Sequence, residues 1–83
     1  MATTPRQRNQ VAIAFGRMLR QARIRSGLSQ EALGLACDID RTYVSMLERG
    51  ERQPSLSTIF ALSQQPGAHP EALVAQTWKA MQD

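Results

Sequence analysis

The sequence predicts an all-α fold, a compact five-helix domain that occupies residues 1–83 as one unit. Apolar residues recur three and four positions apart along most of the chain, which is the period of one helix face. No stretch shows the alternation of apolar and polar residues that marks a strand. Because 83 residues build only one small core, association with a second copy is a natural source of further stability.

The first helix is expected over residues 7–25, and Ser26-Gly27 ends it. Its apolar residues at helical spacing are Val11, Phe15, Met18, Leu19 and Ala22. Residues 1–30 contain six arginines and no acidic residue, although the net charge of the chain is only +3. Those arginines are Arg6, Arg8, Arg17, Arg20, Arg23 and Arg25. Arginine suits phosphates and guanine edges, so the run is either a solvated helix face or a phosphate-binding surface.

A second, short helix followed by a tight turn is expected over residues 29–39. Ser29 is a suitable N-cap, because its hydroxyl accepts a hydrogen bond from a free amide at the helix start. Leu33, Ala36 and Cys37 then share one face. Asp38 stands at the turn, and aspartate tolerates the left-handed conformation better than most residues other than glycine.

A third helix is expected to begin after the N-cap Asp40 and to stop at Gly50. Val44 and Leu47 form its apolar face. The opposite face carries Arg41, Thr42 and Ser45, with Tyr43 and Met46 near the flanks. The two short helices therefore offer one side to the core and one side to a ligand.

The remaining segments also predict helices. After a polar loop over residues 49–54, Ser55 caps a fourth helix, and Gln65-Pro66-Gly67 ends it. The residues expected inside that helix are Ile59, Phe60, Leu62 and Ser63. Pro70 suits the first position of a fifth helix. Its apolar residues are Leu73, Val74, Trp78 and Met81.

The segment 29–50 resembles the phage repressor/Cro-type helix-turn-helix family, and the resemblance extends over about residues 13–76. The matching residues are Gln30, Leu33, Ile39, Val44, Leu47, the Glu48-Arg49-Gly50 ending and the Pro54-Ser55-Leu56 restart. Gly34 stands where the family usually has alanine, and Asp38 where it usually has glycine. The resemblance implies a lambda-repressor-like fold with a central DNA-reading motif. It also implies a small stand-alone regulator similar to restriction-modification controllers.

The resemblance assigns base-reading positions on the third helix to Arg41, Thr42, Ser45 and Met46. Arg41 suits a bidentate contact to guanine, and Thr42 suits a thymine methyl or a base edge. Ser45 can donate or accept a hydrogen bond. Met46 packs either against a base methyl or within the protein.

A further set of residues is expected to contact DNA phosphates: Gln30, Tyr43, Arg49, Arg52 and Arg20. Gln30 stands at a helix start, where free backbone amides also attract anions. The alternative is that Gln30 is simply an exposed residue that favours the helix. Tyr43 either reaches a phosphate through its hydroxyl or fills the seam between helices. The alternative for Arg49 and Arg52 is that they lie in a solvated loop and contact no phosphate.

Two more pairings complete the expected roles. The resemblance pairs Arg23 with Glu48 in a structural ion pair that joins the first helix to the reading helix. The C-terminal helices over residues 55–83 are the expected dimerisation region, with the last helix as the main interface and the fourth helix contributing. The residues assigned to it are Val74, Thr77, Trp78 and Met81.

These features favour a sequence-specific transcriptional regulator that binds double-stranded DNA as a homodimer on an inverted-repeat, palindromic operator. The alternatives are an antitoxin-type autoregulator or a protein-binding adaptor on the same fold; the absence of a long tail after the fifth helix weakens the antitoxin reading. No enzyme, cofactor, metal or small-molecule ligand is expected, because His69 has no partner for a metal site and Cys37 reads as a buried apolar residue. The single cysteine, with no membrane span and no signal peptide, suggests the cytoplasm.

Overall fold

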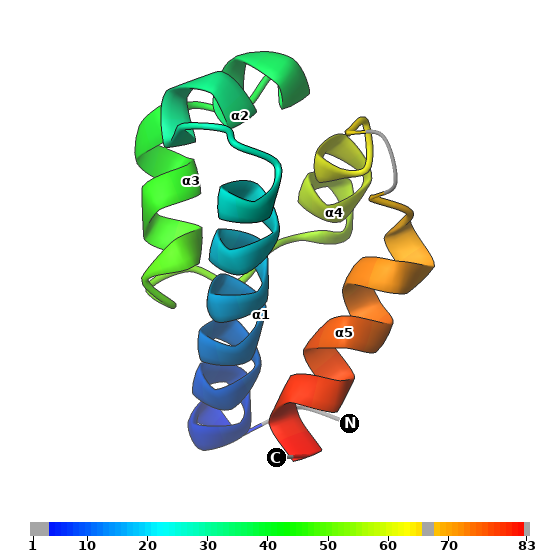
Figure 1. Ribbon diagram of the computed structural model, residues 1–83. Helices are drawn as coiled ribbons and strands as arrows, with labels where there is room; N and C mark the ends of the chain where they lie inside the picture. The colour runs from blue at the N-terminus through cyan, green and yellow to red at the C-terminus, as the bar shows by residue number, and fades with distance from the viewer. Residues whose placement is uncertain (1–3, 66–67, 83) are drawn as a thin grey trace.

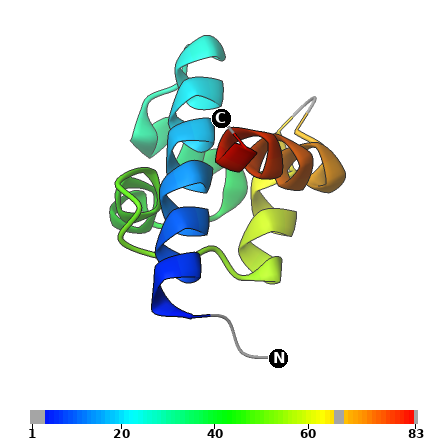
Figure 2. The same ribbon diagram turned by 90° about the horizontal axis from the view of Figure 1, so that it is seen from below.

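The computed structural model describes residues 4–65 and 68–82, and within that part the chain forms five α-helices. The helices are α1 Pro5–Arg25, α2 Gln30–Cys37, α3 Arg41–Glu48, α4 Leu56–Leu62 and α5 Pro70–Gln82. The long helix α1 runs through the middle, with α3 on one side and α4 and α5 on the other (Figures 1 and 2). The predicted all-α fold with five helices is therefore confirmed.

The expected caps explain where three of the helices begin. The side-chain oxygens of Ser29, Asp40 and Ser55 each accept a hydrogen bond from a backbone N–H in the first turn of their helix. The distances are 3.0 Å to Ala32 N, 2.8 Å to Thr42 N and 3.1 Å to Thr58 N. Local sequence alone fixes these starts, because both partners of each bond lie within three residues.

Two predicted helix limits were wrong by a few residues. Helix α1 begins at Pro5 rather than at residue 7. Thr4 is its N-cap, and Thr4 and Gln7 each bond to the backbone N–H of the other, so this capping box fixes the start of the helix. Helix α4 ends at Leu62, and Ser63 is its C-cap, with its hydroxyl donating to Ile59 O at 2.7 Å. The expected stop at Pro66-Gly67 lies outside the described residues.

One hydrophobic core joins all five helices. Val44 and Leu47 of α3 are fully buried. The other members are Phe15, Met18, Leu19, Leu33, Cys37, Leu62 and Leu73. Burial raises the pKa of the Cys37 thiol above its ordinary value, which keeps this side chain in its neutral form within the core.

Helix α3 approaches α1 very closely at Gly16. A Cβ atom on Gly16 would lie 2.3 Å from Leu47 O and 2.7 Å from Glu48 O. The absence of a side chain therefore lets the last turn of α3 rest directly on the backbone of α1. This contact fixes the depth and direction of α3, and so of every side chain that α3 presents outward.

No helix in the described ranges has both the length and the apolar character needed to cross a membrane.

Candidate nucleic-acid interface

The turn between α2 and α3 holds the two helices in a tight unit. Asp38 adopts the left-handed conformation expected for it, with φ 57° and ψ 46°. The N–H of Ile39 then donates to Gly34 O at 2.8 Å. A Cβ on Gly34 would lie 2.4 Å from Ile39 O. Glycine therefore lets the backbone at Ile39 come close to α2, whereas an alanine here would force the two apart. Both departures from the family pattern thus bear on the same turn, Gly34 from within α2 and Asp38 as the C-cap of that helix.

Helix α3 turns its polar face outward. Arg41 and Thr42 are exposed in its first turn, and Ser45 is partly exposed one turn later. Burial of Val44 and Leu47 on the opposite side fixes this orientation, since a helix cannot rotate without withdrawing both from the core. The structure therefore places Arg41, Thr42 and Ser45 on the side of α3 away from the core, where Ser45, like Met46, is only partly exposed.

The two flanking residues of α3 are only partly exposed. The ring of Tyr43 packs against the hydrophobic core, as expected for a residue in the seam between helices. Whether its hydroxyl also contacts a phosphate stays a prediction. Met46 is half-buried as well, so base contact by its side chain also stays a prediction.

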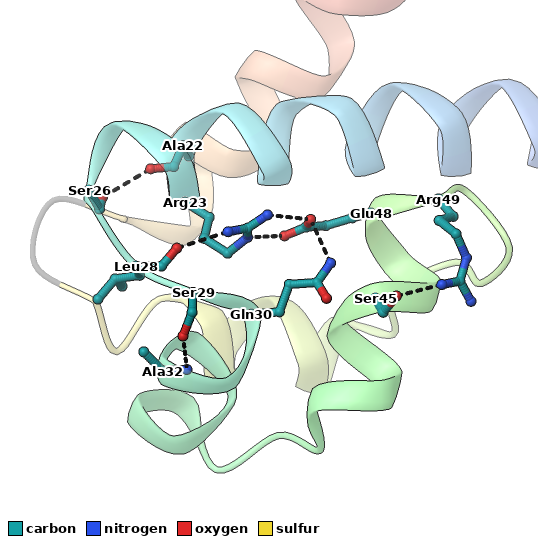
Figure 3. A network of polar contacts seen from close by, with 10 residues as sticks. All are labelled: Ala22, Arg23, Ser26, Leu28, Ser29, Gln30, Ala32, Ser45, Glu48 and Arg49. Atoms are coloured by element: carbon teal, nitrogen blue, oxygen red, sulfur yellow. Dashed lines mark hydrogen bonds and ion pairs between the residues drawn. The ribbon is translucent and has the colours of Figure 1, made fainter.

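A buried cluster of polar contacts locks α3 to α1 (Figure 3). Arg23 Nε donates to Glu48 Oε2 at 2.6 Å, and Arg23 Nη2 donates to Glu48 Oε1 at 3.0 Å. The two side chains are 12% and 2% exposed, respectively. Arg23 Nη1 also donates to Leu28 O at 2.8 Å, which ties the loop before α2 into the cluster. The hydrogen bond to Glu48 raises the pKa of the Arg23 guanidinium, against the opposing effect of burial.

Gln30 belongs to the same cluster, a role that sequence reasoning missed. Its Nε2 donates to Glu48 Oε1 at 3.1 Å, so the side chain joins the start of α2 to the end of α3 (Figure 3). Gln30 is therefore not simply an exposed helix former. One amide N–H remains for another acceptor, and the phosphate contact stays a prediction.

The end of α3 carries a second polar arrangement. Arg49 Nη1 donates to Ser45 Oγ at 2.5 Å, which joins a phosphate candidate to a base-reading candidate. Arg49 Nε also pairs with Glu51, a residue that sequence reasoning did not single out. Only its position two residues after Arg49 would have signalled this pairing. The remaining phosphate candidates, Arg20 and Arg52, are exposed.

The residues of α5 that were assigned to the dimer interface differ in their exposure to solvent. Val74 and Trp78 are 52% and 64% exposed. Thr77 is buried within the chain, and its hydroxyl donates to Leu73 O at 2.8 Å. The assignment of Thr77 to a dimer surface is therefore wrong, because it lies on the side of α5 that faces the core. Met81 is partly buried and lines a groove between α1 and α5.

Helix α4 adds two large apolar residues to the exposed surface. Leu56 is 64% exposed and Phe60 is 51% exposed. Phe60 lies in the fourth helix, which was expected to contribute to the dimer. Helices α4 and α5 pack on each other, and each of them exposes large apolar side chains.

Comparison with known proteins agrees with this geometry. A helix-turn-helix family model matches residues 19–73, which include the last part of α1, the whole α2–α3 unit and α4. The chain belongs to the helix-turn-helix family, and it is a DNA-binding transcription regulator of the control-protein type.

Several relatives are similar over most of their length. Control protein C.BamHI of Bacillus amyloliquefaciens is 42% identical over 67 residues, covering 80% of this chain and 83% of the relative. Control protein C.MunI of a Mycoplasma species is 39% identical over 56 residues, covering 66% and 76%. The crystal structure of the restriction-modification controller protein C.AhdI from Aeromonas hydrophila is similar with a TM-score of 0.70. It shows 40% sequence identity over 75% of this chain and 94% of that one. These relatives are controllers and not enzymes.

Proposed function

We propose that this protein is the transcriptional controller of a restriction-modification system and binds an inverted-repeat operator as a homodimer. The observation that carries the proposal is the outward face of α3, where Arg41, Thr42 and Ser45 are accessible on a helix fixed by the core and by the Arg23–Glu48 cluster. The similarity to C.BamHI and C.AhdI supports the restriction-modification context.

The exposed apolar residues of α4 and α5 support the homodimer. Trp78 and Val74 on α5, with Leu56 and Phe60 on α4, expose large apolar side chains whose burial against a second copy would be favourable. A two-fold dimer would place its two reading helices about one DNA turn apart, roughly 34 Å or 10 base pairs. The operator would then consist of two inverted half-sites.

Selection of bound sequences from a random DNA pool, followed by a salt titration, tests the proposal. We expect an inverted repeat to emerge and its affinity to fall steeply as salt concentration rises, because phosphate contacts release counterions. A protein that prefers no sequence and shows no salt dependence would instead act as a protein-binding adaptor.

Replacing Arg41 with alanine is expected to weaken specific binding by about 1–3 kcal/mol and to relax the preference at one base pair per half-site. The reason is the place of Arg41 in the first turn of α3, exposed beside Thr42. Sequence selection by the variant measures the effect. Lys79→Ala is the control, since Lys79 carries the same charge on α5, across α1 from the reading helix (Figures 1 and 2). An unchanged base preference in Arg41→Ala would contradict the assignment.

Replacing Trp78 with alanine is expected to shift the protein from dimer to monomer while its helices remain folded. The side chain is 64% exposed in the single chain, so its loss removes apolar surface from the interface rather than from the core. Sedimentation velocity measures the assembly state, and circular dichroism measures the helix content. Lys79→Ala, on the same helix, should remain dimeric. Wild-type protein that stays monomeric at high micromolar concentration and binds DNA as a single copy would refute the dimer.

A further inference from the structure

Ser45 is connected to an acidic residue through Arg49. Arg49 Nη1 donates to Ser45 Oγ at 2.5 Å, and Arg49 Nε pairs with Glu51 Oε2. In Figure 3 the Arg49 side chain points back along α3 toward Ser45. The side chains of Arg49 and Glu51 are 55% and 52% exposed, so the arrangement lies on the surface at the end of the reading helix.

We propose that Glu51, by holding Arg49 in place, makes Ser45 a hydrogen-bond donor toward DNA and thereby determines which base edge Ser45 selects. The inference rests on the proposed function, in which Ser45 faces the bases. It adds Glu51 as a specificity-determining residue that acts through its neighbours and not by touching DNA.

The chemistry of the two side chains gives the direction of this effect. A serine hydroxyl has one proton to donate and two lone pairs to accept with, so by itself it discriminates poorly between base edges. A guanidinium group only donates and keeps its charge at any physiological pH. Arg49 therefore occupies one of the two lone pairs of Ser45 Oγ, and the hydroxyl proton of Ser45 points away from Arg49. The positive charge of the adjacent guanidinium makes the remaining lone pair a poor acceptor for a second donor such as the cytosine amino group, so donation is the favoured role of this hydroxyl.

A hydroxyl in this state favours bases that present acceptors in the major groove. Guanine offers N7 and O6 there, and thymine offers O4, whereas cytosine offers the N4 amino donor. Ser45 is thus expected to prefer guanine or thymine over cytosine at the base that it faces. This preference requires both Ser45 and Arg49, since a serine without the bound guanidinium can also accept a hydrogen bond from the cytosine amino group.

Glu51 keeps Arg49 in this position when DNA is near. A DNA phosphate attracts the same guanidinium, and without a competing carboxylate the long, exposed side chain is free to turn toward the backbone. An exposed glutamate is charged in the neutral range, and the hydrogen bond from Arg49 lowers the pKa of Glu51 further. With Nε and Nη1 engaged by Glu51 and Ser45, Arg49 still has Nη2 to donate to a phosphate.

Selection of binding sites from a random DNA pool tests the inference with Glu51→Ala, Ser45→Ala and the double variant. Glu71→Ala is the matched control, because Glu71 is an exposed acid in the first turn of α5 and its loss changes the net charge equally. Glu51→Ala should reduce the preference against cytosine at one base pair per half-site by about 2- to 10-fold, the worth of one hydrogen bond. Glu71→Ala should retain that preference.

The double variant separates an effect through Ser45 from a general effect of charge. Ser45→Ala should lose the preference, and adding Glu51→Ala should change it no further. Wild-type selectivity in Glu51→Ala, or a further change in preference in the double variant, would overturn the inference while leaving the proposed function intact. A wild-type protein that selects no sequence would overturn the proposed function, and this inference with it. Circular dichroism verifies that each variant is folded.

Discussion

Replacing Gly16 with alanine is expected to destabilise the protein by about 1–3 kcal/mol, although alanine is the better helix former. The new Cβ would lie 2.3 Å from Leu47 O and 2.7 Å from Glu48 O, and both of these are backbone atoms that no side-chain rotation can move. At an exposed helix position the same change would stabilise the protein by up to about 1 kcal/mol. A loss of stability in Gly16→Ala would therefore show that the clash with α3 outweighs the higher helix propensity of alanine.

Urea unfolding followed by circular dichroism measures the change in the free energy of unfolding. The matched control is Gln21→Ala, an exposed position on the same helix, where the change should stay within about 0.5 kcal/mol. Since α1 and the last turn of α3 must separate to accept the methyl group, we also expect weaker DNA binding by the folded variant. A Gly16→Ala protein as stable as the wild type would mean that the two helices are not seated as closely as described.

Replacing Glu48 with alanine is expected to cost about 3 kcal/mol of stability, at the low end of the range for breaking a buried ion pair. Arg23 would lose both of its hydrogen bonds to the carboxylate, and Gln30 would lose its acceptor. We expect the low end of this range because the Arg23 side chain is 12% exposed and keeps its hydrogen bond to Leu28 O. Its charge would therefore remain partly solvated and hydrogen-bonded.

The double variant Arg23→Met/Glu48→Leu distinguishes the stranded charge from the value of the pair itself. Replacing both partners with apolar side chains removes the unpaired charge, so we expect this variant to recover most of the stability lost by Glu48→Ala. Thermal and urea unfolding of the three proteins provide the comparison. A Glu48→Ala loss below about 1 kcal/mol would show that the cluster behaves as a surface pair.

This cluster leads us to expect that stability and DNA binding are linked in the molecule. Arg23 and Glu48 join α1 to the end of α3, while Gln30 joins the same carboxylate to the start of α2. One carboxylate therefore holds three helices, and the first turn of α2 is attached to the reading helix by more than the connecting turn. Substitutions in the cluster should change both the free energy of unfolding and the alignment of α3 with DNA.

The sequence by itself determined the helices and the turn, because these depend on residues close together in the chain. The N-caps Ser29, Asp40 and Ser55 bond to amides two or three positions away. The left-handed Asp38 follows from the tolerance of aspartate for that conformation. The capping box of Thr4 and Gln7 was equally local, so the error at the start of α1 came from a signal that was present and overlooked.

Only the tertiary structure decided the contacts that depend on how one helix packs on another. Helical spacing placed Thr77 and Trp78 on one face with Val74, but the direction in which α5 packs on α1 buries Thr77 and exposes Trp78. Gln30 and Glu48 lie 18 positions apart, and no local pattern indicates that they share a hydrogen bond. The pairing of Glu51 with Arg49 depends on how the chain leaves α3. Helix periodicity fixes the angle between neighbouring side chains, whereas the packing of one helix on another decides which of those side chains meets the core, a partner or solvent.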